Sequence, residues 1–89
     1  IIITGIYADD FDRTIRVFPN PTTGSVIIAG KGLENRAFGI SIFNTFGKAV
    51  MTFENVFSLD LSGLSAGIYY LTILTDRSEY TSKKIVLVK

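Results

Sequence analysis

The sequence predicts an all-β domain, an immunoglobulin-like antiparallel β-sandwich of about seven strands. Apolar and polar residues alternate with a period of two through most of the chain, which is typical of half-buried strands. Turn-forming residues recur about every ten residues, at the spacing expected of short strands joined by hairpin-length links. The chain has 89 residues, enough for one domain with a modest core, and no stretch has a convincing helical period.

The first residues differ in composition from the rest. We expect residues 1–12 to be a linker or the end of a preceding domain, and residues 13–89 to be the folded domain. This linker is acidic, but it lacks the glycine and the distal glutamate of a known calcium-binding loop. We therefore expect its acidic side chains to be solvated: Asp9, Asp10 and Asp12.

A rigid corner, with the sequence VFPNPTTG, follows a strand expected over residues 13–18. Pro19 and Pro21 fix two φ angles and have no N–H, so the strand must end here or leave its sheet. Asn20 has a side chain that bonds nearby backbone groups, and Gly24 is able to adopt a positive φ before the next strand. We interpret the stretch as a preset turn between two strands.

The next strand has Val26 and Ile28 on one and the same face, and a loop then leads to a hairpin. The arms of this hairpin are expected over residues 38–43 and 48–53. Gly47 supplies the left-handed backbone that such a connection usually needs.

Three phenylalanines near Lys48 have the composition of a stacking platform for single-stranded nucleic acid: Phe43, Phe46 and Phe53. The formal net charge is +1, which supplies too little attraction to phosphates for that function. We therefore expect no nucleic-acid partner, and we expect packing within the hairpin to account for all three rings.

Two further strands are separated by a glycine-containing turn. In FSLDL the alternation places Phe57, Leu59 and Leu61 inward. In AGIYYLTI, Gly67 lies two positions before Tyr69, a spacing that resembles the tyrosine corner of immunoglobulin-like sandwiches. We expect this tyrosine to bond backbone across the preceding loop.

The last residues, KKIVLVK, are expected to form a strand that is apolar on both faces. Ile85 and Leu87 are expected to face the core, with Val86 and Val88 on the other face. One interpretation is a strand buried on both sides. The other is a free edge or apolar patch that receives a partner and also permits self-association, with the neighbouring lysines limiting that pairing.

Composition excludes several functions. The chain has no Cys and no His, which removes thiolate nucleophiles, sulfur-based zinc sites and imidazole bases. We therefore expect no enzyme activity, no catalytic residues, no metal and no cofactor. No apolar run approaches the length of a membrane-spanning helix.

Four blocks in order, VFPNPTTG, ISIFNTFGKAV, LDLSGLSAGIYYLTI and SKKIVLVK, resemble the C-terminal sorting domain, type A, of cargo proteins of the type IX (Por) secretion system. The resemblance covers residues 17–89 and implies a source among the Bacteroidetes. It implies an export signal that directs an N-terminal cargo domain of the same precursor through the periplasm and across the outer membrane. The implied partners are the translocon, shuttle and sortase components. Sortase cleavage and attachment of the cargo to surface lipopolysaccharide would follow, leaving the cargo at the cell surface or outside the cell.

The family motifs fall on particular residues of this chain. The family's Pro-Asn-Pro motif falls on Pro19, Asn20 and Pro21, with Gly24 after it, and its Gly-x-Tyr motif falls on Gly67 and Tyr69. We expect a structural role for all of these and for Gly47, the last on its turn chemistry and the others on the resemblance. The resemblance assigns translocon recognition to the terminal basic and apolar segment: Lys83, Lys84, Ile85, Val86, Leu87, Val88 and Lys89.

An alternative is a non-catalytic immunoglobulin-like spacer or a carbohydrate-binding module of a secreted protein. Carbohydrate modules present exposed aromatic rings to sugars. Because Trp is absent, the candidate rings here are Tyr7, Tyr70 and Tyr80.

Overall fold

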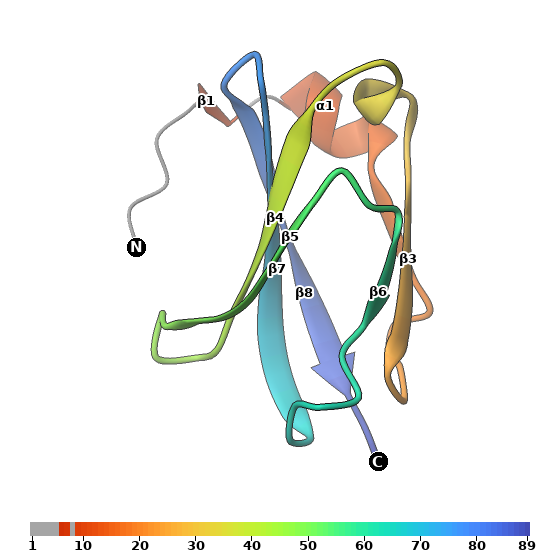
Figure 1. Cartoon of the computed structure of the whole chain (residues 1–89), viewed down its shortest axis with the longest axis vertical. Helices are drawn as coiled ribbons and strands as arrows, with labels where there is room; N and C mark the ends of the chain where they lie inside the picture. Colours follow the sequence, from red (N-terminus) through yellow and green to blue (C-terminus); the bar gives the residue numbers. More distant parts are fainter. Residues whose placement is uncertain (1–5, 8) are drawn as a thin grey trace.

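Two β-sheets pack face to face in the computed structural model, which describes the backbone of residues 6–7 and 9–89 and the side chains of residues 11–89 (Figure 1). The larger sheet has the strand order β1-β8-β7-β4-β5, and the smaller has the order β2-β3-β6. The bounds are β1 Ile6–Tyr7, β2 Arg16–Phe18, β3 Ser25–Ala29, β4 Phe38–Phe43, β5 Ala49–Glu54, β6 Ser58–Asp60, β7 Gly67–Thr75 and β8 Glu79–Leu87. Strands β2 to β8 pair antiparallel with their neighbours, while β1 pairs parallel with β8. The predicted all-β sandwich is confirmed.

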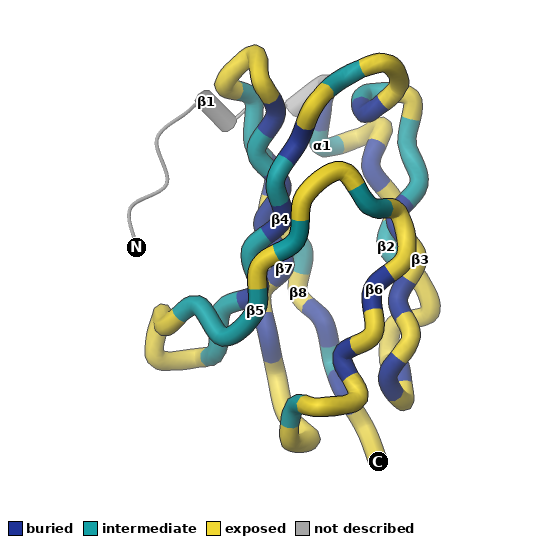
Figure 2. The backbone as a smooth tube through the Cα atoms, in the orientation of Figure 1, coloured by how far each residue is buried: buried dark blue, intermediate teal, exposed yellow. Residues whose placement is uncertain are grey.

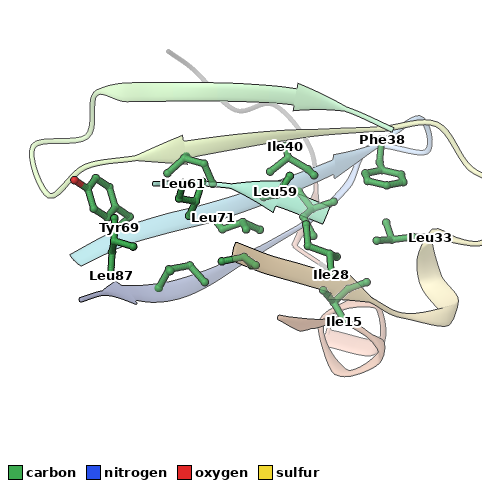
Figure 3. Close-up of a cluster of buried hydrophobic side chains, with 14 of the residues drawn as sticks. Ile15, Ile28, Leu33, Phe38, Ile40, Leu59, Leu61, Tyr69, Leu71 and Leu87 are labelled. Carbon is green, nitrogen blue, oxygen red and sulfur yellow. The ribbon is translucent and has the colours of Figure 1, made fainter. Parts of the chain in front are cut away.

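Alternation along the strands produces the core, as expected. Val26 and Ile28 of β3 face β4 and β7 residues such as Ile40 and Leu71, and all are at most 1% exposed. Figure 3 shows Ile28, Ile40 and Leu71 lying between the two sheets, and Figure 2 shows buried and exposed positions alternating along the strands. The fully buried set is aliphatic apart from one threonine: Ile28, Leu33, Ile40, Ile42, Leu59, Leu61, Leu71, Ile73, Ile85, Leu87, Val26 and Thr81.

The expectation of no helix is wrong. A helix, α1, spans Asp9–Thr14, and a single 3₁₀ turn, η1, spans Lys31–Leu33. The strand expected over residues 13–18, which is β2, consequently begins at Arg16 rather than at residue 13. Among the helix residues whose side chains the structure describes, 11–14, the one large buried side chain is Phe11, at 4% exposure, so there is no 3.6-residue apolar period to detect. The domain boundary near residues 10–12 stays a prediction.

α1 packs closely on η1. A Cβ built on Gly32 would lie 2.6 Å from Thr14 Oγ1 and 2.7 Å from Phe11 Cδ1, so the contact requires a residue without a side chain. Thr14 Oγ1 also donates a hydrogen bond of 2.8 Å to the Phe11 carbonyl within the helix. No helix in the described part of the chain is long and apolar enough to cross a membrane.

The β4–β5 hairpin forms within one residue of its predicted arms. Gly47 has a φ of 80°, the left-handed conformation expected of it. Two aromatic expectations nearby are wrong. Phe46 at the tip is 93% exposed instead of packed, and Phe57 is 48% exposed, with one edge of its ring against Phe38 at a centroid distance of 5.2 Å. Turn geometry, which aims side chains outward, overrides the apolar character of Phe46.

Candidate functional site

The terminal strand β8 divides its residues between two faces. Ile85 and Leu87 point into the core and are 0% and 1% exposed. Lys84 is exposed, Val86 is half-buried, and Val88, just past the strand, is 42% exposed. The predicted alternation is confirmed, and a strand buried on both sides is excluded.

The outer edge of β8 is not free, which corrects the open-edge expectation. The Asn20 side chain occupies the place of a neighbouring strand: its Nδ2 donates to the Lys84 carbonyl at 2.6 Å, and its Oδ1 accepts from the Val86 N–H at 3.0 Å. Thr22 continues the pairing with its backbone, donating to the Val86 carbonyl at 2.9 Å and accepting from the Val88 N–H at 2.8 Å. The corner covers the edge because residues 20–22 run parallel to it. Self-association through this edge would require these four bonds to open.

The earlier residues of β8 contact α1 and β1. Lys83 Nζ donates to Asp12 of α1 at both the carboxylate, 2.8 Å, and the backbone carbonyl, 3.1 Å. Thr81 Oγ1 donates to the same carboxylate, and β1 pairs with the beginning of β8. We expected Asp12 to belong to a solvated acidic linker, and this expectation is wrong. Its carboxylate instead contacts the terminal strand. The side chains of Asp9 and Asp10 lie outside the described residues.

The exposed side chains of β8 join those of β7 on the outer face of the larger sheet. Ile68 is the register partner of Val86, and Tyr70 is the partner of Lys84. Both β7 residues are 40% exposed. We call the set Ile68, Tyr70, Lys84, Val86 and Val88 the terminal face. It is a largely apolar surface in which Lys84 and Tyr70 stand opposite each other on paired strands. Sequence reasoning missed the two β7 residues, because only strand pairing brings them beside the chain end.

The structural-motif residues lie around this strand. Both peptide bonds that precede Pro19 and Pro21 are cis. Gly24 is buried, with a φ of 159°, and its N–H donates to Thr22 Oγ1 at 3.1 Å. This bond to Gly24 helps to hold Thr22, whose backbone pairs with the β8 edge.

Tyr69 makes the predicted corner. Its Oη donates to the Ser65 carbonyl at 2.6 Å, across the loop before β7, while its ring is buried at 7% exposure. Gly67, at the first position of β7, has a φ of 156° and open space where a Cβ would be. These contacts fix the loop at the end of the sandwich where the chain terminates (Figure 1).

Other candidates are less organised. Tyr70 is exposed and Tyr80 half-buried, while the side chain of Tyr7 lies outside the described residues. Within residues 11–89, no group of three or more His, Cys, Asp or Glu side chains is placed to hold a metal ion. Asp60 accepts a hydrogen bond from the Ser62 N–H at 2.9 Å. The side-chain and backbone hydrogen bonds of Ser62 lower the pKa of the Asp60 carboxyl below its ordinary value.

Comparison with known proteins identifies one family. Residues 16–88 match the family model described as "Secretion system C-terminal sorting domain". The match begins at the first residue of β2 and extends one residue beyond β8, so it covers both sheets except β1. No curated protein matches the chain.

Proposed function

The chain belongs to the family of secretion system C-terminal sorting domains, and from this premise we propose that its terminal face is the surface through which the type IX translocon recognises it. As a sorting domain, it is the export signal of a type IX cargo protein, whose destination is the outer-membrane surface or the extracellular space. The proposal concerns which residues carry that signal.

The observation that supports the proposal is the division of β8 into two sets of residues. Ile85 and Leu87 are used by the core, and Lys83 is held by Asp12, so these three are poorly placed to meet a partner. Lys84, Val86 and Val88 lie outside the sandwich, beside Ile68 and Tyr70. Apolar side chains next to an ammonium group suit a partner with an apolar patch and acidic groups at its rim.

The remaining steps belong to the same proposal, and family membership supports them. The precursor passes through the periplasm, where shuttle components of the machinery deliver the domain to the translocon. A sortase cleaves in or before residues 1–12 and joins the N-terminal cargo to surface lipopolysaccharide. The domain itself takes part as a bound signal and not as a catalyst, which is supported by the absence of His and Cys from the chain.

A passenger fusion tests the signal. Residues 1–89 are placed behind a fluorescent passenger with an N-terminal signal peptide and expressed in a type IX-competent bacterium, with surface protease accessibility as the readout. We expect surface exposure in the wild type and periplasmic retention in a translocon-deficient strain. Passenger that stays periplasmic in both strains, although the domain is folded, would refute the export function.

Point variants then test the face. Val86→Ser and Lys84→Glu should each reduce surface passenger at least tenfold while the purified domains still melt cooperatively. Ile27→Ser is the matched control, because Ile27 is 44% exposed on the outer face of the smaller sheet, between β2 and β6. Equal export of all three variants would mean that recognition lies elsewhere on the domain.

A carbohydrate-binding module remains a second candidate because Tyr70 is 40% exposed. If a sugar stacks on this ring, titration calorimetry with a set of soluble glycans should detect its binding. Tyr70→Ala should then weaken the measured affinity. Absence of binding at millimolar glycan would remove this candidate.

A further inference from the structure

Phe46 is the most exposed large apolar side chain in residues 11–89, and nothing in the fold accounts for it. It lies at the tip of residues 44–47, the tip turn, which projects beside the sandwich between β4 and β5 (Figure 1). Asn44 holds this turn: its Oδ1 accepts from the Phe46 N–H at 2.9 Å and from the Lys48 N–H at 3.0 Å. The Gly47 N–H adds a bond of 3.0 Å to the Asn44 carbonyl. The Asn44 N–H also donates to the Lys48 carbonyl at 2.9 Å. The ring is thus presented to solvent by a turn that these four local hydrogen bonds hold.

The turn does not need an aromatic residue at this position. Its geometry is set by Asn44 and by Gly47 at a φ of 80°, and polar residues are the usual occupants of such turns. A single exposed apolar residue is common on protein surfaces and carries little weight alone. The surroundings of Phe46 therefore decide its meaning.

A groove lies between the tip turn and the loop that precedes β7. It has a volume of about 410 Å³, and it is lined by the tip turn on one side and by Leu64, Ala66 and Gly67 on the other. Small residues on that second wall leave room for an inserted side chain. Ile68, which belongs to the terminal face, also lines the groove, so the two surfaces are continuous. We call Phe46 and this groove the end surface.

Three lysines surround the end surface and the terminal face. Lys48 adjoins the tip turn, and Lys84 lies in the terminal face. Lys89 Nζ donates to the Ser62 carbonyl at 2.6 Å, in the loop between β6 and β7. This end of the sandwich therefore combines apolar side chains with positive charge, which is complementary to an acidic rim around an apolar pocket.

We propose that the end surface is a second contact for the protein that reads the terminal face, with Phe46 inserting into an apolar pocket of that partner and a partner side chain entering the groove. The inference rests on the proposed function, because it assumes that the translocon is the partner. A protein is favoured over a lipid surface because the planar surface of a bilayer would meet the projecting ring but not the walls of the groove, whereas a protein can present a side chain to each. An aromatic anchor of this kind typically dominates the energy of an interface.

The test compares export rates of the full fusion protein. Phe46→Ser should slow surface appearance of the passenger at least tenfold, equivalent to about 1.4 kcal/mol of lost recognition. Phe46→Leu, which keeps an apolar side chain at this position, should recover most of that loss, and Ile27→Ser, on the outer face of the smaller sheet and outside the groove lining, should export as wild type. Thermal melting of each purified domain checks that all remain folded.

Crosslinking identifies what contacts the ring. A p-benzoyl-phenylalanine residue at position 46 is activated by light during export, and the same residue at position 27 serves as the control. We expect a crosslink from position 46, and none from position 27, to an outer-membrane protein of the type IX machinery, lost in the translocon-deficient strain.

The outcomes separate the two proposals. Normal export of Phe46→Ser together with loss of export in Val86→Ser overturns the second contact and leaves the proposed function intact. Crosslinks to lipid alone, or to the passenger alone, also overturn it. Passenger that never depends on the translocon overturns the proposed function itself, whatever Phe46 does.

Discussion

Asn20→Ala is the substitution that most directly tests how the corner secures the terminal strand. It removes both side-chain bonds to β8, at the Lys84 carbonyl and the Val86 N–H, and it leaves the two backbone bonds of Thr22 in place. The change adds no volume and breaks no core contact, because the Asn20 side chain is exposed. Any loss of stability therefore reports these two hydrogen bonds.

The expected cost follows from their exposure. Water reaches both freed backbone groups, so the penalty for a buried unsatisfied group does not apply, and each bond contributes its net value of about 0.5–1.5 kcal/mol. The sum is about 2 kcal/mol, out of a total stability of about 5–15 kcal/mol for a domain. For a domain of this size such a loss lowers the Tm by roughly 8–16 °C.

Circular dichroism melting and urea unfolding of the purified domain measure the effect. Thr23→Ala is the matched control, because Thr23 is an exposed neighbour in the same corner. Amide hydrogen exchange gives a local readout, since the Val86 N–H should exchange faster in Asn20→Ala while the β4 amides change less. A Tm within about 2 °C of wild type, or an equal fall in Thr23→Ala, would refute the assignment of Asn20 as a substitute for a strand.

Four further substitutions have expected outcomes. Tyr69→Phe should lower the free energy of unfolding by about 1–2 kcal/mol in urea titrations, because the Oη bond to the loop carbonyl is lost. Gly47→Ala should cost about 1 kcal/mol by the same measurement, since its φ of 80° strains any residue with a Cβ. Lys83→Met should lower the free energy of unfolding by less than about 1 kcal/mol, because its ion pair with Asp12 is partly exposed. The loss should be smaller in high salt, and the α1 amides should exchange faster in the variant. Asp60→Asn should destabilise the domain at neutral pH but not in acid. The pKa of this carboxyl is lowered by folding, so its contribution is present above the ordinary value of 3.8 and is lost as pH falls, and a pH-independent difference in Tm would contradict this.

The part of the fold that sequence predicts well is the part that local alternation determines. Period-two patterns predict the β4–β5 hairpin, the shared face of Val26 and Ile28 in β3 and the two faces of β8. In such a pattern the polarity of each residue indicates on which face of its strand it lies. The tyrosine corner was also predictable, because Tyr69 bonds a carbonyl only four residues away.

The contacts that sequence did not predict span long separations. Asn20 bonds backbone groups 64 and 66 residues further along the chain, and Asp12 meets Lys83 across 71 residues. Nothing in the local pattern marks these pairs. The exposure of Phe46 was missed for a different reason: a phenylalanine in an apolar segment is usually packed, and only the direction of the turn places this ring in solvent.

Recognition of the terminal segment is expected to depend on the folded sandwich, because two of the five residues of the terminal face come from β7. Ile68 and Tyr70 adjoin Val86 and Lys84 only when β7 and β8 are paired in register. An unfolded tail with the same last residues would expose Ile85 and Leu87 as well and would lose the β7 contribution. Deleting residues 83–89 therefore removes two core side chains along with the signal, at a cost of several kcal/mol, and cannot distinguish the two roles. Substitutions confined to the outward positions of β7 and β8 can, because they change the surface and leave the core packing intact.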